Sequence, residues 1–160
     1  MKKETKRDLV LAILWMAVIF IHSAMPGDLS GAESGFFAAW LAKWLPIEKE
    51  LLHLFVRKGA HLAEFLILGV LLQRLFARAE FRKWPEMGTF ARNGCAFFCG
   101  VCYAVTDEVH QLFVDGRAGQ VRDVLIDAAG VLLGVLITHF ARRNKQKSGE
   151  KACKIKENTC

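Results

Sequence analysis

Apolar residues gather in four long stretches, which are separated by segments rich in charged, glycine and proline residues. The four stretches run from Leu9 to Met25, from Gly59 to Ala77, from Phe90 to Phe113 and from Val121 to Phe140. An α-helix needs about 20 consecutive, mostly apolar residues to cross the hydrocarbon core of a bilayer. The pattern therefore predicts an all-α, polytopic membrane protein whose four transmembrane helices form one bundle.

The last three stretches approach this length only if acidic residues such as Glu64, Asp107 and Asp127 are counted inside them. A soluble four-helix bundle is therefore the alternative. The basic residues favour the membrane protein. Of the 22 Lys and Arg residues, four lie before the first stretch, five lie from Arg74 to Arg92 around the connection between the second and third stretches, and seven lie from residue 142 onward. Since an excess of Lys and Arg marks cytoplasmic segments, we expect a multi-pass protein of the cell (cytoplasmic) membrane with cytoplasmic N- and C-termini.

The length and charge of the chain also indicate its domain organisation and its partners. A chain of 160 residues suits one domain, and we expect a membrane domain over residues 1–141 followed by a basic cytoplasmic tail over residues 142–160. The net charge of +6 is spread over both termini and the middle connection, which argues against nucleic acid as a partner. The basic start has no small-x-small cleavage site before Pro26, so we expect an uncleaved first span rather than a signal peptide.

The connection between the first two stretches predicts a short amphipathic helix. Ser34 can cap it and Pro46 ends it, and its large apolar side chains recur with helical spacing. These side chains are Phe36, Phe37, Trp40, Leu41, Trp44 and Leu45. Tryptophan on the apolar face of such a helix is typical of the membrane interface. We expect this helix on the outer leaflet, and a helix that simply covers the bundle is the alternative.

The five cysteines do not suggest a disulfide framework. Cys95, Cys99 and Cys102 recur at i, i+4 and i+7 in the third stretch and therefore share one helical face. Small, polarizable side chains of this kind fill the space between helices. We expect them to pack there rather than to form a metal or redox site.

Polar residues interrupt the last three stretches in a regular way and fall on one face of each predicted helix. The faces carry Arg57, Lys58, His61 and Glu64 in the first of these helices, Tyr103, Asp107, His110 and Gln111 in the next, and Asp123, Asp127, Gly130 and Gly134 in the last. Glu108 points further round. An ionisable residue inside a membrane needs a partner, a water-filled cavity or a function. The two glycines instead indicate a close approach between helices.

The predicted topology brings these polar groups to one end of the bundle. The second span runs inward and the third outward, so the start of one and the end of the other lie near the outer face. The fourth span runs inward again, which places Asp123 and Asp127 at the same depth. Ser23, at the end of the first span, adds a hydroxyl group there. We expect the inner halves of the spans to be more uniformly apolar.

Several kinds of chemistry suit such a cluster. A divalent metal is one, because imidazole and carboxylate groups bind zinc, manganese and iron. The candidate metal ligands are His61, Glu64, His110 and Asp107. Proton transfer between a histidine and a carboxylate is another, and Arg117 with Lys58 can bind a phosphate or carboxylate group. The structural alternative is a paired polar network that fixes the helix register without any chemistry.

Three segments in this order carry a specific signal: RKGAHLAEFLILGVLL, YAVTDEVHQLFVDGR and RDVLIDAAGVLLG. Together with WMAVIFIHSAMPG near the start, they resemble the VanZ-like family of small bacterial membrane proteins. The resemblance implies candidate catalytic positions at His61, Glu64, Asp107, Glu108, His110, Asp123 and Asp127, and candidate binding positions at Ser23, Lys58, Gln111 and Arg117. Met25 and Asp115 depart from the family pattern, in which Gln and Pro are common.

The resemblance also implies a role at the cell envelope, because the founding member is associated with low-level resistance to teicoplanin, a glycopeptide with a lipid tail. Our first hypothesis is a protein that alters how the outer surface of the membrane meets a lipid-bearing antibiotic or a lipid-linked cell-wall precursor. The second is a membrane-embedded hydrolase or transferase acting on a lipid-linked phosphate, with Glu64 or His110 as base and Arg117 as anion clamp. The third is an ion- or proton-coupled carrier, for which a homo-oligomer would supply further polar groups.

Overall fold

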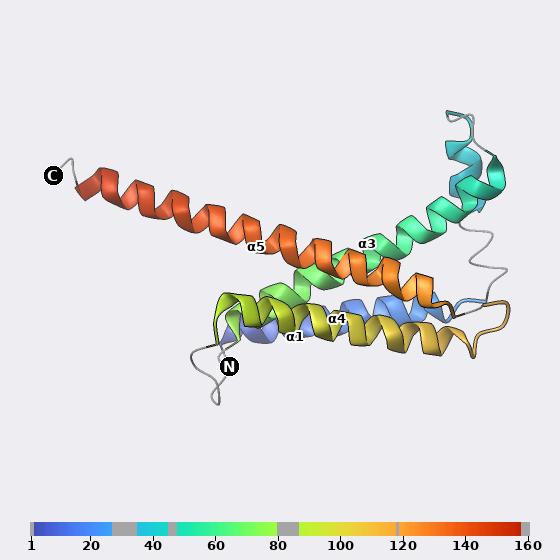
Figure 1. Ribbon diagram of the computed structural model, residues 1–160, viewed down its shortest axis with the longest axis horizontal. Helices are drawn as coiled ribbons and strands as arrows, with labels where there is room; N and C mark the ends of the chain where they lie inside the picture. The colour runs from blue at the N-terminus through green and yellow to red at the C-terminus, as the bar shows by residue number, and fades with distance from the viewer. Residues whose placement is uncertain (1, 27–34, 45–47, 80–86, 118, 158–160) are drawn as a thin grey trace.

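The computed structural model describes residues 2–26, 35–44, 48–79, 87–117 and 119–157, and the regular structure in them is helical. The long helices are α1 (Lys3–Ser23), α3 (Lys49–Arg78), α4 (Thr89–Gln111) and α5 (Val121–Glu157). A short helix over residues 35–41 lies between α1 and α3 in the chain. The prediction of an all-α protein is confirmed, and Figure 1 shows the arrangement of the helices.

Each of the four predicted apolar stretches forms the larger part of one long helix, but two helices extend beyond their stretch. Helix α3 begins at Lys49 rather than near Gly59, and α5 continues past Phe140 to Glu157. The basic segment therefore continues the last helix without a break at residue 142. The division into a membrane domain over 1–141 and a tail over 142–160 stays a prediction.

Two of the described helices, α3 and α5, are long and apolar enough to cross a membrane, over Glu50–Arg78 and Val121–Gly149. Helix α1 opens with a charged segment at residues 3–8, and α4 carries Asp107 and Glu108 in its last turns. These charges shorten the apolar length of both helices. Two candidate spans are therefore established from helix length and composition, where the sequence pattern predicts four.

Helix α3 lies at the centre and contacts each of the other three long helices. It crosses α5 in the middle of the molecule, while α1 and α4 run beneath this crossing (Figure 1). The crossing is close because glycines line it: a Cβ atom on Gly134 would lie 2.1 Å from the Leu66 carbonyl oxygen, and one on Gly130 would lie 2.5 Å from that of Leu62. The close helix approach predicted from Gly130 and Gly134 is confirmed.

The middle of the bundle is an apolar layer. Ile19, Phe65, Leu68 and Val131 are fully buried in it, one or more from each of three helices, and Ala96 and Ala104 of α4 complete it. This layer lies between polar residues on both sides along every long helix. The core therefore separates two polar ends of the bundle.

The end of the bundle opposite Asp107 also contains buried polar groups, which the sequence analysis did not identify. Asp8 of α1 is completely buried and forms ion pairs with Arg78 and, at 3.3 Å, with Arg74 of α3. Gln73 is also buried and donates a hydrogen bond to Asn93 of α4 at 3.2 Å. These buried polar groups are tolerated at this end of the bundle because they have partners on neighbouring helices.

The expectation that the three cysteines of α4 pack between helices is wrong for two of them. Cys99 and Cys102 are exposed, and Cys95 is half-buried. The buried face of α4 is instead lined by smaller residues, including Ala96, Gly100 and Ala104. Gly100 accommodates Val131 of α5, since a Cβ atom at this glycine would lie 2.5 Å from a Val131 methyl group.

The short helix between α1 and α3 exposes the aromatic side chains that predicted it. Phe36, Phe37, Trp40 and Trp44 are all more than half exposed. Ala38 on the opposite side is buried. An exposed face of this kind is expected of a helix on a membrane surface. Its predicted cap Ser34 and its predicted end at Leu45 and Pro46 lie outside the described residues.

Candidate functional site

Asp107, near the end of α4, is a centre of the polar cluster predicted from the sequence. Its Oδ2 atom accepts hydrogen bonds from the Ser23 hydroxyl at 2.8 Å and from the Gln111 amide nitrogen at 3.0 Å. All three residues are buried. Ser23 ends α1, so this network joins the end of the first long helix to the last turns of α4.

His61 of α3 and Asp127 of α5 lie beside Asp107. One ligand atom from each of the three side chains can be chosen such that all lie within 4.8 Å of one another. Asp127 is only 1% exposed, and neither of its oxygens has a hydrogen-bond partner in the described part of the chain. The same is true of His61 Nδ1 and Asp107 Oδ1. Buried polar atoms without partners are uncommon, and they indicate a place for a proton, a water or a ligand.

The donor set at this point fits a divalent cation. Two carboxylates and one imidazole supply oxygen and nitrogen ligands and two negative charges. Of the four metal ligands predicted from the sequence, His61 and Asp107 belong to this group and Asp127 joins them. Glu64 and His110 lie outside it, where Glu64 pairs with His22 and His110 stacks on Phe20.

Glu64 pairs with His22, a residue that the sequence analysis did not select. The His22 Nδ1–H group donates to Glu64 Oε1 across 2.6 Å, and the indole N–H of Trp15 donates to the Glu64 backbone carbonyl at 2.9 Å. The His22 ring also stacks near His61, with 6.2 Å between ring centroids. Helix α1 therefore contributes an imidazole as well as a hydroxyl to the site. Its position next to Ser23 at the end of the first span is the sequence signal that could have identified it.

His110 lies against α1. Its ring stacks on Phe20, with 4.2 Å between centroids, and its Nδ1 atom is buried without a hydrogen-bond partner among the described residues. Tyr103, one turn from Asp107 on α4, donates a hydrogen bond to the Met16 carbonyl at 2.6 Å. Both contacts attach α4 to α1 beneath the site.

Two acidic residues at the rim have structural partners. Asp123, in the first turn of α5, forms an ion pair with Lys58 of α3. Glu108 is buried, and its Oε2 atom accepts a hydrogen bond from the Gln120 backbone N–H at 2.9 Å. Gln120 immediately precedes α5. The Glu108 carboxylate therefore lies at the positive end of the α5 helix dipole, where a negative charge is stabilising. These contacts set the start of α5 against α3 and α4.

Arg117 closes the site over the end of α1. The turn before it places Gly116 at φ 72°, a left-handed conformation that glycine adopts without a steric cost. The Arg117 guanidinium donates to the Met25 carbonyl at 3.1 Å and to the His22 carbonyl at 3.4 Å. Burial lowers the pKa of this guanidinium, and the nearby Arg57 lowers it further, whereas Asp107, Glu108 and Glu64 raise it. Its Nη1 atom is buried without a partner among the described residues, and can donate to a ligand.

The eleven site residues predicted from the sequence thus lie at the same end of the bundle, where the end of α1, the early turns of α3, the end of α4 and the start of α5 meet (Figure 1). The structure links them in small groups. Ser23, Gln111, His61 and Asp127 surround Asp107, while Glu64 pairs with His22, and Lys58 with Asp123. Residues from three segments distant in sequence therefore lie together at one end of the bundle, and their common depth in a membrane stays a prediction.

Comparison with known proteins identifies the family of the chain. The family model described as VanZ/LLP1 matches residues 9–142, a range that reaches all four long helices. The chain is 34% identical over 97 residues to the membrane protein YwnJ of Bacillus subtilis (strain 168), an alignment that covers 61% of this chain and 59% of YwnJ. The chain thus spans about three fifths of the length of this curated relative. No solved structure matches the chain significantly. The chain is therefore a membrane protein that belongs to the VanZ/LLP1 family.

Proposed function

We propose that this chain is a four-span protein of the cytoplasmic membrane whose polar cluster faces outward and binds a lipid-bearing envelope ligand. In this proposal the ligand is a lipid-linked cell-wall precursor or a lipid-tailed glycopeptide. Binding at the outer surface of the membrane lowers susceptibility to antibiotics of the teicoplanin type. Both termini lie in the cytoplasm, as the distribution of basic residues favours.

The surfaces of α1 and α4 support a membrane position for these two helices as well as for α3 and α5. Large apolar side chains are exposed along α1, among them Ile13, Leu14 and Ile21, and along α4 at Phe98 and Val105. A protein in water rarely exposes such a continuous apolar surface, whereas a lipid-facing helix requires one. The family match over residues 9–142 also treats the four helices as one unit.

The observation that carries the proposal is Asp127. A network that only fixed the helix register would satisfy its buried members with one another, as Ser23 and Gln111 do for one oxygen of Asp107. Asp127 is buried with two unpartnered oxygens, and it faces His61 at 4.0 Å and the equally buried Asp107. Keeping such a carboxylate costs free energy. We therefore expect Asp127 to bind a ligand rather than to stabilise the fold.

The test compares wild type with Asp127→Asn in a teicoplanin-sensitive Gram-positive host, at matched abundance in the membrane. The substitution keeps the shape of the side chain and breaks no hydrogen bond between described residues. Asp115→Asn is the matched control, because this residue lies exposed in the turn between α4 and α5. We expect wild type and the control to raise the inhibitory concentration of teicoplanin and Asp127→Asn to lose that protection.

Equal protection by all three proteins would show that Asp127 and the polar cluster have no role in resistance to teicoplanin. Protection by none of them, together with an unchanged envelope lipid profile, would remove the proposed role in the envelope altogether. Membrane abundance is measured in each strain, since a loss of protection with a loss of protein would show only that the variant is unstable.

A membrane-embedded hydrolase or transferase is the second candidate, and the group of His61, Asp107 and Asp127 favours it. A divalent metal held by these side chains would polarise a phosphoryl oxygen or activate a water. Arg117, with its free Nη1 atom, would donate to the anionic substrate. Purified wild type should then retain about one equivalent of metal and turn over lipid-linked phosphates, and Asp127→Asn should do neither. A metal-free wild type without turnover argues for the binding role.

A carrier is the third candidate, and the apolar layer argues against it. A carrier needs polar groups along a path to the inner side. In the described residues the fully buried Phe65, Leu68 and Val131 separate the outward cluster from the polar groups around Asp8. Proteoliposomes that show no proton or cation flux would agree with this assignment.

A further inference from the structure

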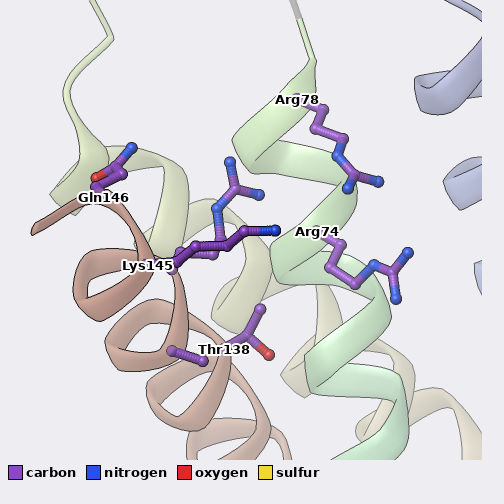
Figure 2. Close-up of a pocket in the computed structure, with 7 residues that line it drawn as sticks. Arg74, Arg78, Thr138, Lys145 and Gln146 are labelled. Carbon is purple, nitrogen blue, oxygen red and sulfur yellow. The ribbon is translucent and has the colours of Figure 1, made fainter. Parts of the chain in front are cut away.

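A second polar site lies at the opposite end of the bundle from Asp107. A cavity of about 540 Å³ opens between the last turns of α3 and the basic half of α5. It is lined by Arg74, Arg78, Thr138, Ala141, Arg142, Lys145 and Gln146. Figure 2 shows Lys145 extending from α5 across the opening toward α3. Four cationic side chains from two helices therefore surround one concave site.

The two arginines of α3 are already held in place. Arg74 and Arg78 extend toward α1 in Figure 2, where they form ion pairs with Asp8. Arg78 also approaches Glu4, at 3.8 Å. Arg74 and Arg78 therefore line the α3 side of the cavity, while their guanidinium groups are held against α1.

The two cations of α5 are not neutralised. Arg142 and Lys145 form no hydrogen bond or ion pair within the described part of the chain. Asp8 and Glu4 face Arg74 and Arg78, so the excess charge comes from Arg142 and Lys145. The cavity therefore carries an excess of positive charge, and it attracts an anion.

The cavity lies where the surface of α5 changes from apolar to basic. Leu136, Ile137 and Phe140 are exposed just before it. Residues 142–149 just after it are polar or glycine, with four basic side chains. For a helix of a membrane protein, this transition marks the level at which acyl chains give way to phosphate groups.

We infer that this cavity binds the headgroup of an anionic phospholipid such as phosphatidylglycerol. Lys145 and Arg142 contact the phosphate, and Gln146 is within the cavity to hydrogen-bond the glycerol. An acyl chain lies along Ala141 and the exposed apolar residues of α5. Basic pockets between helices at the cytoplasmic face commonly hold such lipids. The inference rests on the membrane topology of the proposed function, but it concerns the opposite end of the bundle and does not depend on a role for Asp127.

The test measures lipid retention by native mass spectrometry. Delipidated protein in detergent receives phosphatidylglycerol or phosphatidylcholine, with and without millimolar inorganic phosphate. The variant Arg142→Gln/Lys145→Gln removes the free cations of the cavity. The control Lys6→Gln/Lys147→Gln removes the same charge from exposed positions that do not line it. Thermal unfolding of each protein in detergent verifies that the fold is intact.

We expect wild type and the control to retain phosphatidylglycerol in preference to phosphatidylcholine. The cavity variant should retain phosphatidylglycerol about tenfold less, because each basic side chain near an anionic lipid contributes substantially to binding. Equal losses in the two variants would show a general surface-charge effect and overturn the site. If inorganic phosphate displaces the lipid completely and no lipid preference remains, the cavity is a site for soluble anions, and the inference is likewise wrong.

Discussion

Asp107 and Asp127 are buried carboxylates at the same end of the bundle, but their surroundings differ. Asp107 accepts hydrogen bonds from Ser23 and Gln111, whereas both oxygens of Asp127 lack a partner among the described residues. A satisfied buried acceptor contributes to stability, and an unsatisfied one costs free energy until a proton or ligand meets it. Asp107 therefore contributes to the stability of the fold through its two hydrogen bonds. Asp127 needs a proton or a ligand to satisfy its oxygens.

Substitution of Ser23 by alanine tests how much the hydrogen bond between Ser23 and Asp107 contributes to the stability of the fold. The hydroxyl donates to a buried carboxylate, and hydrogen bonds to charged groups contribute about 1.5–3 kcal/mol. We expect Ser23→Ala to lower the free energy of unfolding by about that amount, measured by thermal unfolding of purified protein in detergent. Ser148→Ala, at an exposed position of α5, should leave the midpoint unchanged. Equal midpoints for both variants would mean that this hydrogen bond does not stabilise the fold.

At the scale of the helices, the pairing of α3 with α5 organises the molecule. Gly134 and Gly130 of α5 face carbonyl oxygens of α3, and Gly69 of α3 faces the Val131 carbonyl, at 2.3 Å from a Cβ placed on it. Small residues allow such an approach, which lets van der Waals contacts drive association inside a membrane. Because His61 and Asp127 come from these two helices, the same contact sets the geometry of the site.

Alanine at glycine positions of this pair should have effects of opposite sign. At Gly134 the new methyl group would lie 2.1 Å from the Leu66 carbonyl oxygen, so the helices must separate, at a cost of about 1–3 kcal/mol for overpacking. At Gly59 of α3 nothing lies within 4 Å, and alanine should stabilise the helix by about 0.5–1 kcal/mol. Unfolding midpoints in detergent measure both. A Gly134→Ala variant as stable as Gly59→Ala would contradict the close crossing.

The helices and the glycine contact could be predicted from the sequence, because each depends on spacing along one chain segment. The partner of each side chain could not be predicted in the same way. His22 was missed because it stands inside an otherwise apolar stretch, and only the packing of α1 against α3 brings it to Glu64. Asp8 was not identified either, because its partners lie 66 and 70 residues away in the sequence. Rotation about each helix axis decides such pairs, and a single sequence does not fix it.

At the scale of the whole molecule, polar, apolar and polar layers follow one another along the bundle. The cluster around Asp107 and Asp127 contains both acids and bases, whereas the other end is dominated by arginine and lysine. Arg92, at that second end, donates to the carbonyl groups of Phe76 and Ala79 and so holds the end of α3. Two chemically different ends suit a protein that meets different surroundings on the two sides of a membrane.

This polarity predicts which end faces out, and single cysteines can test it. In a variant whose five native cysteines are replaced, Asp115→Cys places a thiol in the turn between α4 and α5, and Ser148→Cys places one on the basic half of α5. A membrane-impermeant maleimide should label Asp115→Cys in intact cells and Ser148→Cys only after permeabilisation, because the basic end stays in the cytoplasm. The reverse pattern would invert the bundle and place the Asp127 cluster inside. Labelling of both thiols in intact cells would mean that α5 does not cross the membrane, in conflict with its long apolar surface.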